Sequence, residues 1–407
     1  MKPVWSIKPL GELCKTGAGG TPLKSVKEYY EGGDVPWLLS GEVSQGEITE
    51  ATNFITQKGL QSSSAKLFPP NTVLIAMYGA TAGQVGILRF EASTNQAVCG
   101  ILPSEHFLPE FLFYFFLHKK DELVAQAAGN AQPNISQIKI RSMGVPTASL
   151  PEQHRIVTIL DEAFDGIATA KANAEKNLQN ARALFESHLQ SVFTKRDEGW
   201  VEKTVGELVE DGVLVKPFDG NHGEIHPRKS EHVESGVPFI MACDLQDGGV
   251  DTEGCKFIPR KLADSLRVGF ARDEDVLISH KGTIGRSAVV NTDLDYIMLT
   301  PQVTSYRIKD ASALSNGFVR YYFMSPSFQR EMIAGAADGA TRAYIGITKQ
   351  LSLRFRFPSL AEQKRIVAKL DVLDPETQRL ESLYQQKLSA LDDLKKSLLH
   401  QAFSGKL

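Results

Sequence analysis

The sequence has little of what marks a membrane, secreted or metal-binding protein. Its most apolar run, residues 111–117, is far shorter than the roughly 20 residues that a membrane-spanning helix needs. The amino terminus has no apolar segment of signal-peptide length. The four cysteines are scattered and form no CxxC pair, which argues against a disulfide framework and a standard zinc site. We therefore expect a cytoplasmic protein with reduced cysteines and no metal.

Catalytic motifs and a basic charge excess are also missing. The sequence has no GxxxxGK phosphate loop and no Asn/Asp-Pro-Pro-aromatic tetrapeptide of the kind that grips a flipped adenine. Its net charge is −3, whereas proteins that bind duplex DNA alone usually carry a basic excess. This charge neither supports nor excludes DNA binding, because local clusters of Lys and Arg and the charges of partner subunits decide it.

What the sequence does contain is an internal repeat. SLPEQHRIVTILDEAF from Ser149 returns as SLAEQKRIVAKLDVL from Ser359. Upstream, VPWLLSGEV matches VPFIMACDL, NTVLIAMYGATAG matches EDVLISHKGTIG, Asn95-Gln96 matches Pro301-Gln302, and GNAQPNIS matches GATRAYIG. The matches keep one order at an offset of about two hundred residues, and 407 residues are enough for two cores. We therefore expect two copies of a domain, each followed by a helix.

The local patterns inside each copy indicate an α+β domain. β-rich runs that end in glycine-rich turns, at residues 72–78 and 275–281, predict strands, and apolar stretches at 110–117 and 317–324 predict helices packed on a sheet. The expected fold is therefore two globular α+β domains in tandem, each followed by a long helix. The expected boundaries are 1–148 for the first domain, 149–197 for its helix, 198–358 for the second domain and 359–407 for its helix.

The segment after each domain predicts a long helix. Ser149 with Glu152, and Ser359 with Glu362, match the S-x-x-E pattern of a capping box. Some forty residues would make each helix about 60 Å long. That length exceeds what a compact domain needs, and it disfavours the alternative of two surface helices on separate cores.

Apolar residues in these segments recur in steps of three and four, which favours pairing of the two helices as a coiled coil. The first seam has a four-residue stutter before Leu178, and Asp374-Pro375 is expected to break the second helix, with Pro375 at a first helical position. The candidate pairing residues are Ile156, Leu160, Ile167, Leu178, Ile366, Leu370, Leu380, Leu391 and Leu398.

These segments resemble a known family. PEQHRIVTILD from Pro151, AEQKRIVAKLD from Ala361 and the closing SLLHQAFSGKL from Ser397 are similar to the two conserved helical regions of specificity subunits of type I restriction-modification enzymes. GGTPLKSVKEYYEGGDVPWL from Gly19, with YGATAGQVG, resembles one class of target recognition domain. DGNHGEIHPRKSEHVESGVPFI from Asp219, with HKGTIGRSAVV, IMLTPQVTSYRI and GATRAYIGITKQL, resembles another. The first copy ends in SVFTKRDEG where the second has AFSGKL, as a chain that enters a second domain must.

The resemblance implies a non-catalytic DNA-recognition subunit. Each domain would bind one half of a bipartite double-stranded target in the major groove, and the helices would pair antiparallel and set the gap. The chain would bind two modification (methyltransferase) subunits and, through them, restriction subunits. S-adenosylmethionine, ATP and Mg²⁺ would belong to these partners, with no cofactor on this chain. The alternatives are a methylation-only or related defence complex, an enzyme of unfamiliar type, and a helical scaffold that binds no DNA.

The loops after the predicted strands are candidate DNA contacts, because glycines permit close approach and Gln, Lys and Arg can reach base edges. A plain strand-to-strand turn is the alternative. The segments before the helices are further candidates, with a solvated linker as the alternative. The candidates are Tyr78, Gly79, Thr81, Gln84, Asn130, Gln132 and Asn134 in the first copy and His280, Lys281, Thr283, Arg286, Thr341, Arg342 and Tyr344 in the second.

Polar loops near the start of each copy supply the last candidates. Asn221 and His222 belong to a polar loop, and Lys24 is either a phosphate contact or a surface lysine. His222 and His226 are four residues apart, with two cysteines downstream. Because Gly223 and Pro227 oppose a helical histidine pair, a structural or DNA-facing role is favoured over zinc binding.

Overall fold

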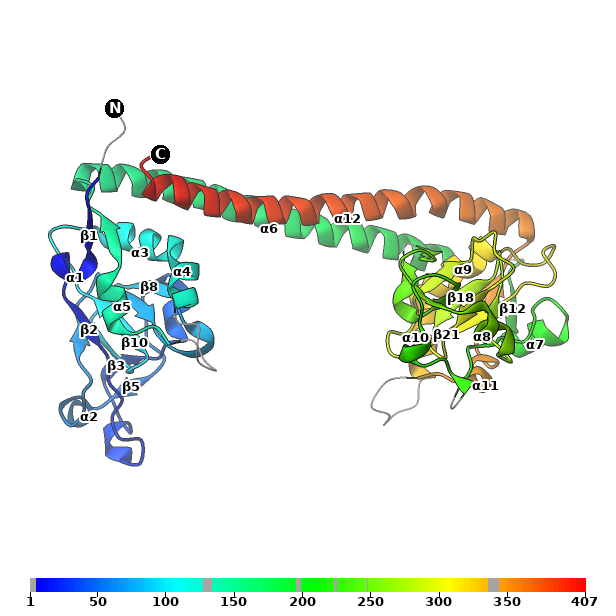
Figure 1. Cartoon of the computed structure of the whole chain (residues 1–407), viewed down its shortest axis with the longest axis horizontal. Helices are drawn as coiled ribbons and strands as arrows, with labels where there is room; N and C mark the ends of the chain where they lie inside the picture. Colours follow the sequence, from blue (N-terminus) through cyan, green and yellow to red (C-terminus); the bar gives the residue numbers. More distant parts are fainter. Residues whose placement is uncertain (1–4, 127–133, 195–198, 223–224, 247, 336–343) are drawn as a thin grey trace. The chain divides into compact units, whose positions relative to one another are not determined.

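The computed structural model describes residues 5–126, 134–194, 199–222, 225–246, 248–335 and 344–407. The chain forms two compact units (Figure 1). Unit 1 consists of Met1–Ala174 and Lys387–Leu407, and unit 2 consists of Glu175–Gln386. Each unit therefore contains one globular domain together with one end of each long helix.

The domain of unit 1 is built on two main sheets, with strand orders β2-β10-β7-β8-β4 and β5-β3-β9-β6. Helix α3 packs on strands β7 and β8, and β1 pairs with β11 (Figure 1). The strands are β1 (Ile7–Pro9), β2 (Thr16–Ala18), β3 (Val35–Leu38), β4 (Glu47–Ile48), β5 (Phe54–Ile55), β6 (Leu67–Phe68), β7 (Val73–Ala76), β8 (Val85–Leu88), β9 (Ala92–Thr94), β10 (Val98–Ile101) and β11 (Gly144–Pro146). The helices are α1 (Leu10–Leu13), α2 (Gln57–Gln61), α3 (Pro109–His118), α4 (Lys120–Gln126) and α5 (Gln137–Ser142), with short 3-10 turns η1 (Lys27–Tyr29), η2 (Glu42–Gln45) and η3 (Gly79–Thr81).

The domain of unit 2 repeats this plan, with sheets ordered β16-β13-β20-β17 and β19-β18-β21 and helix α9 on β18 and β19. The strands are β12 (Val201–Thr204), β13 (Val237–Ile240), β14 (Leu245–Gln246), β15 (Gly249–Val250), β16 (Lys256–Ile258), β17 (Phe270–Ala271), β18 (Val276–Ser279), β19 (Ser287–Val289), β20 (Ile297–Leu299), β21 (Val303–Tyr306) and β22 (Arg354–Phe357). The helices are α7 (Val205–Glu210), α8 (Arg260–Ser265), α9 (Asn316–Met324), α10 (Pro326–Ala334) and α11 (Ile347–Gln350), with 3-10 turns η5 (Lys229–Glu231) and η6 (Ala242–Asp244).

The sequence repeat is a repeat of topology. In each domain one sheet contains a parallel pair between antiparallel neighbours, β3 with β9 in unit 1 and β13 with β20 in unit 2. The turns into β7 and β18 both place a non-glycine residue in the left-handed region, since Asn71 and Glu274 each have a φ of 68°. The prediction of two α+β domains in tandem is confirmed.

One detail of the sequence match is corrected by the hydrogen bonds. The amide of Asn95 donates to the carbonyl of Leu38 at 2.9 Å, and the amide of Thr300 donates to the carbonyl of Ile240 at 3.0 Å. Asn95 therefore corresponds to Thr300 and not to Pro301. Matching Gln96 to Gln302 by residue identity shifts the sequence alignment by one residue relative to the backbone hydrogen bonds.

Both long helices begin where the sequence predicted, α6 (Leu150–Thr194) and α12 (Leu360–Phe403). The expected capping boxes are wrong in detail. The carboxylate of Glu152 accepts two hydrogen bonds from the guanidinium of Arg155 one turn later, and Glu362 binds Arg365 in the same way. An arginine three residues on competes with the helix amides for the same carboxylate.

A buried glutamine in the first turn fastens each helix to its own domain. Gln153 accepts from the amide of Leu108 at 2.9 Å and donates to the carbonyl of His106 at 2.8 Å. Gln363 makes the equivalent bonds with Ser315 and Ala313 at 3.0 and 2.8 Å. Both glutamine side chains are fully buried, so their amides must be satisfied by these carbonyls and amides. This explains why the glutamine occurs in both copies.

The helices pair antiparallel within each unit. In unit 1 the end of α12, with Leu399 and Ala402, shares an apolar cluster with Ile156 and Leu160 near the start of α6. In unit 2 the end of α6 shares a cluster with the start of α12. Among the candidate pairing residues, Ile156, Leu160, Ile167, Ile366 and Leu370 are buried and Leu178, Leu380, Leu391 and Leu398 are half-buried.

Two ion pairs define the register of this pairing. Lys171 binds Asp392 in unit 1, and Arg182 binds Glu381 in unit 2, each at 2.7 Å. In both pairs the two residue numbers add to 563. The same antiparallel register therefore holds in both units.

The break expected at Asp374-Pro375 is not formed, because α12 continues through Pro375. The Asp374 carboxylate is buried and does not cap a new helix. It accepts from the guanidinium of Arg320 on α9 at 2.5 Å and from the amide of Gln378 at 3.1 Å. Proline removes one helical hydrogen bond, and the contact of Asp374 with Arg320 in the domain offsets that cost locally. The sequence pattern could not reveal a partner 54 residues away.

The buried pair of Arg320 and Asp374 predicts a non-additive effect on stability. Arg320→Leu or Asp374→Leu alone should lower the free energy of unfolding of unit 2 by about 3–5 kcal/mol, because each leaves a buried charge without its partner. The double variant should regain most of this loss, since the equivalent positions in unit 1 hold Phe113 and Phe164. Urea unfolding of the full chain measures both.

The exposed Arg330 on α10 is the matched control, and Arg330→Leu should change stability by less than about 0.5 kcal/mol. A double variant as unstable as the sum of the two single variants would show that the ion pair does not couple these positions.

Candidate nucleic-acid interface

Each domain presents a short glycine loop between two strands of one sheet. Glycine loop 1, residues 78–84, joins β7 to β8, and glycine loop 2, residues 280–286, joins β18 to β19. Each loop has two glycines with positive φ, 70° at Gly79 and 79° at Gly83, and 81° at Gly282 and 94° at Gly285. Residues with a Cβ rarely adopt these angles, so both loops require glycine at both places.

The second glycine of each loop is also a point of close packing. A Cβ at Gly285 would overlap the amide of Gln329 on α10, which donates to the Gly285 carbonyl at 2.9 Å. A Cβ at Gly83 would lie 2.9 Å from a methyl group of Val124 on α4. The first glycine of each loop has open space around its Cβ position. Each loop is therefore fixed at its second glycine and free at its tip.

The segment before α5 or α11 lies against the start of each loop. Tyr78 and Asn134 form an antiparallel bridge in unit 1, as Lys281 and Tyr344 do in unit 2. The amide of Ile135 donates to the Met77 carbonyl at 2.9 Å, with an equivalent bond of 3.1 Å in unit 2. The glycine loop and the segment before the short helix, which the sequence analysis proposed as separate DNA contacts, are thus adjacent in both domains. The candidates Asn130, Gln132, Thr341 and Arg342 lie outside the described residues.

Most of the other candidates are accessible. The side chain of Tyr78 is 38% exposed, and glycine loop 2 exposes three polar side chains. The exposed candidates are Lys24, Tyr78, Asn134, His222, Lys281, Thr283 and Arg286, and the half-buried ones are Gly79, Thr81, Gln84 and Tyr344. Lys24 lies in the loop that follows Thr21, whose hydroxyl donates to the side chain of Gln96.

Two candidates are buried, and we assign them positioning roles. Asn221 is 2% exposed, and its side-chain amide donates to the carbonyl of Val268 at 2.6 Å while its oxygen accepts from the amide of Arg267 at 3.1 Å. His280 has no exposed surface. Neither side chain can reach a base directly, but both hold loops that carry exposed candidates.

His280 belongs to a buried polar chain beneath glycine loop 2. Its Nδ1 lies 2.6 Å from the hydroxyl of Thr304. Gln350 donates to the same hydroxyl at 3.0 Å and to the carbonyl of Ile345 at 3.1 Å. The chain therefore connects the loop to α11 and to the segment that bridges it. In unit 1 the position of His280 is occupied by Met77.

Burial lowers the pKa of His280 to about 4, and the nearby carboxylate of Asp219 opposes this only in part. Removing an imidazolium from water is costly, so the ring stays neutral at physiological pH. Asp219 is already hydrogen-bonded to His222, at 2.8 Å, and lies 3.7 Å from Nε2 of His280.

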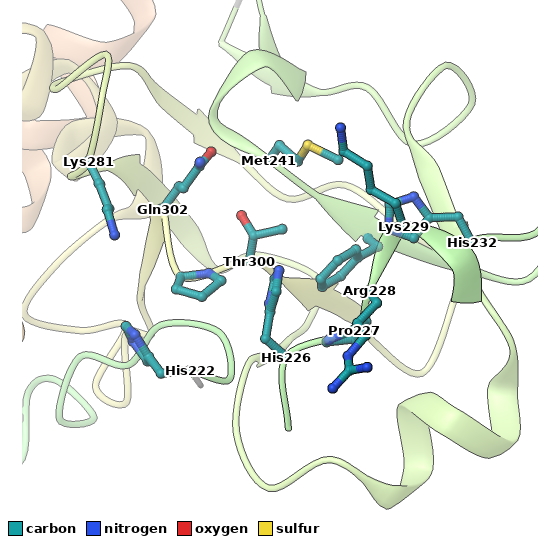
Figure 2. A pocket seen from close by; sticks show the side chains of 12 residues that line it. His222, His226, Pro227, Arg228, Lys229, His232, Met241, Lys281, Thr300 and Gln302 are labelled. Atoms are coloured by element: carbon teal, nitrogen blue, oxygen red, sulfur yellow. The ribbon is translucent and has the colours of Figure 1, made fainter. Parts of the chain in front are cut away.

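A pocket of about 620 Å³ lies beside glycine loop 2 (Figure 2). We call it the basic pocket, because its lining includes three cations and three imidazoles, from Lys281, Arg228, Lys229, His222, His226 and His232. The sequence analysis missed Arg228 and Lys229. Their only signal is a basic dipeptide after Pro227, and such a pair is usually part of a solvated surface.

The two histidines and two cysteines weighed as zinc ligands do not assemble. In the described part of the chain, no group of three or more His, Cys, Asp or Glu side chains is arranged to hold a metal ion. Cys14, Cys99 and Cys255 are buried and Cys243 is exposed, all with free thiols. None of the described helices combines the length and apolar character needed to cross a membrane.

Comparison with known proteins places this fold in a class. Residues 4–179 match the family model described as the type I restriction modification DNA specificity domain. The MjaIX specificity subunit of Methanocaldococcus jannaschii is 25% identical over 307 residues, which cover 70% of this chain and 68% of that protein. The MjaVIII specificity subunit of the same organism is 21% identical over 413 residues, 99% and 93% of the two chains. The EcoR124I/EcoR124II specificity subunit of Escherichia coli is 28% identical over 168 residues, 40% and 41% of the two chains.

Solved structures share the whole fold. A chain from work on complex assembly and conformational transition of the type I R-M system superposes with a TM-score of 0.77 at 21% identity, over 100% of both chains. The HsdS subunit from Thermoanaerobacter tengcongensis gives 0.60 at 19%, over 100% of this chain and 98% of that one. These are tandem-domain proteins with the same architecture. Residues 4–179 therefore resemble a type I restriction modification DNA specificity domain, and over most of its length the chain is similar to type I specificity subunits.

The buried His280 predicts a pH-dependent stability of unit 2. Its folded pKa of about 4 lies below its unfolded value of about 6.5, so the unfolded chain binds the extra proton between these values. Stability is therefore lost as the pH falls from about 6.5 to 4, by up to about 3 kcal/mol from this residue. His280→Met should remove that loss, as measured by urea unfolding at a series of pH values.

The reciprocal substitution is the matched control. Met77→His places an imidazole at the equivalent buried position and should give unit 1 a new loss of stability over the same pH range. Hydrogen exchange followed by mass spectrometry assigns each effect to its unit. An unchanged pH dependence in His280→Met would show that this imidazole does not control it.

Proposed function

We propose that this chain recognises a bipartite double-stranded DNA target, with one half-site bound by each domain in the major groove. The observation that carries the proposal is the repeated pairing of a glycine loop with the segment before the helix. The two domains share this backbone arrangement but carry different side chains on it. Two similar frames with unlike surface chemistry suit a protein that binds two unlike half-sites.

The exposed groups have the chemistry that base recognition needs. Arg286 can donate two hydrogen bonds to guanine, and amides such as those of Gln84 and Asn134 can pair with adenine in the major groove. Free backbone amides at the glycine tips suit phosphate oxygens. Base contacts from these side chains and phosphate contacts from the loops would together fix each domain on its half-site.

The chemistry that follows recognition belongs to partner subunits in this proposal. The chain directs two modification subunits, which use S-adenosylmethionine, and restriction subunits, which use ATP and Mg²⁺, and it works in the cytoplasm. The relatives are named as specificity subunits, which supports this division of labour. The recognition domains are residues 1–148 and 198–358, and residues 149–197 and 359–407 form the spacer helices between the two half-sites.

A domain exchange tests the proposal. Replacing residues 198–358 with the corresponding domain of a relative of known target should change one half-site and leave the other intact. Selection of bound duplexes from a random pool, with the modification subunits present, followed by sequencing, measures both halves. The E. coli relative matches over a domain-sized stretch, which is what exchangeable domains require.

Exchange of residues 1–148 is the matched control and should alter the opposite half-site. If either exchange changed both half-sites, or if the parent chain selected no sequence, independent recognition by the two domains would be refuted.

The length of the helix pair should determine the number of base pairs between the two half-sites. We would insert four residues after Gln179 in α6 and four after Leu383 in α12, because the shared register places these sites opposite one another. One added turn lengthens the pair by about 6 Å, close to two base pairs of rise. It also rotates the helix by about 40°, while two base pairs rotate the duplex by about 70° in the same sense.

The spacer should therefore lengthen by one to two base pairs, and the half-site sequences should stay the same. A seven-residue insertion in both helices is the matched comparison. It adds about 10 Å but turns the helix by about −20°, against about 100° for three base pairs, so it should weaken binding more. An active four-residue variant that kept the parental spacer would rule out the helices as the determinant of spacing.

A further inference from the structure

We propose that the basic pocket of unit 2 is a phosphate-binding site, and that its occupant is one backbone phosphodiester of the DNA bound by the second domain. The inference rests on the proposed function, because it names which part of the DNA enters this pocket. It concerns Arg228, Lys229 and Lys281, whose side chains line the pocket.

The cations of the pocket are available to a ligand. Arg228, Lys229 and Lys281 are exposed, and within the described ranges none has a carboxylate within ion-pair distance. Two carboxylates contact residues of the pocket lining without pairing with these three cations. Asp219 is bound to His222, and the carboxylate of Glu231 accepts from the backbone amide of Arg228 at 2.7 Å. Among the described residues, neither carboxylate therefore forms an ion pair with Arg228, Lys229 or Lys281.

The pocket is a built cavity and not a flat patch of lysines. Its inner wall includes Phe239, which is 1% exposed and has the rings of His226 and His232 packed at 5.6 and 5.9 Å. Thr300 also lines it, and its hydroxyl is buried without a hydrogen-bond partner among the described residues. Figure 2 shows Thr300 between Lys281 and Lys229. A buried hydroxyl without a partner is costly, and an anion oxygen would satisfy it.

The position of the pocket explains how a phosphate there would help recognition. Lys281 belongs both to the pocket and to glycine loop 2, five residues before Arg286. Phosphate contacts set the register of a protein on the duplex, whereas base contacts carry the sequence information. A phosphodiester held in the pocket would fix the backbone next to the loop whose tip faces the bases.

Unit 1 fills the equivalent place with neutral groups. Trp37 stands where unit 2 has Phe239, and its indole N–H donates to the carbonyl of Gly20 at 3.0 Å. The ring of Tyr30 packs edge-on against it at 5.9 Å, and Thr21 binds Gln96. The inference is therefore specific to the second domain, and the two half-sites should differ in their dependence on salt.

The test measures duplex affinity of the full chain with its modification subunits over a range of salt concentrations. The variant Arg228→Gln/Lys229→Gln should reduce the slope of log affinity against log salt by about 1, because one phosphate contact is lost. Affinity should fall equally for all sequences, and the selected half-sites should not change. The variant Lys261→Gln/Lys309→Gln removes the same charge from exposed positions outside the pocket and should leave the slope unchanged.

A second arm locates the phosphate on the DNA. Single methylphosphonate substitutions along the second half-site should reveal one position that weakens binding of the parent chain but not of the Arg228→Gln/Lys229→Gln variant. Thermal unfolding of each variant confirms that it is folded. An unchanged salt slope in the pocket variant, or a methylphosphonate scan without such a position, would overturn the proposal.

Two further outcomes separate the possible failures. Binding of inorganic phosphate to the pocket, without any effect of the methylphosphonates, would show a site for free anions and would overturn assignment to DNA. Failure of the parent chain to select a sequence would refute the proposed function. The salt slope on random-sequence duplex would still report whether the pocket holds a phosphate.

Discussion

The structure depends on the rigid attachment of each long helix to the domain that precedes it. A fully buried glutamine in the first turn bonds to the loop before α3 or α9, through Gln153 in unit 1 and Gln363 in unit 2. A tyrosine on α3 or α9 then binds an aspartate of the long helix about two turns beyond the glutamine, Tyr114 with Asp161 and Tyr321 with Asp371. Because the glutamine contacts are buried and all of these hydrogen bonds are specific in direction, they fix the angle at which each helix leaves its domain.

The two glycine loops share one backbone conformation but carry different side chains. Positive φ values at paired glycines and a backbone bridge to a distant segment are conformational requirements, and they are met in both copies. The side chains on that frame face solvent and contribute little to stability. They can therefore differ between Tyr78 and Lys281 without changing the fold. This separation lets one architecture present two different surfaces to a ligand.

The sequence predicts those features that are local or repeated. The tandem copies, the helix starts, the glycine loops and most exposed candidates could be predicted, because turn chemistry, helix periodicity and self-similarity are visible in one chain. Long-range partners could not. The sequence predicts His280 as a DNA contact, whereas the structure buries it beside Thr304. It predicts a helix break at Asp374-Pro375, whereas Asp374 binds Arg320, which lies 54 residues away in the sequence. The basic pocket could not be predicted for the same reason, since Arg228 and Lys281, which both line it, are distant in sequence.

The two domains differ in the chemistry of the residues that pack beneath the glycine loop and against the long helix. Where unit 1 has Met77, Phe113 and Phe164, unit 2 has His280, Arg320 and Asp374. A further buried carboxylate in unit 2, Asp275, binds Arg307 at 2.7 Å. Apolar packing tolerates shape changes and is insensitive to pH, whereas buried polar chains demand one geometry and respond to proton concentration. Unit 2 should therefore be the more sharply defined and the more acid-sensitive of the two. The basic pocket beside glycine loop 2 should also make binding of a polyanion by unit 2 the more strongly dependent on salt.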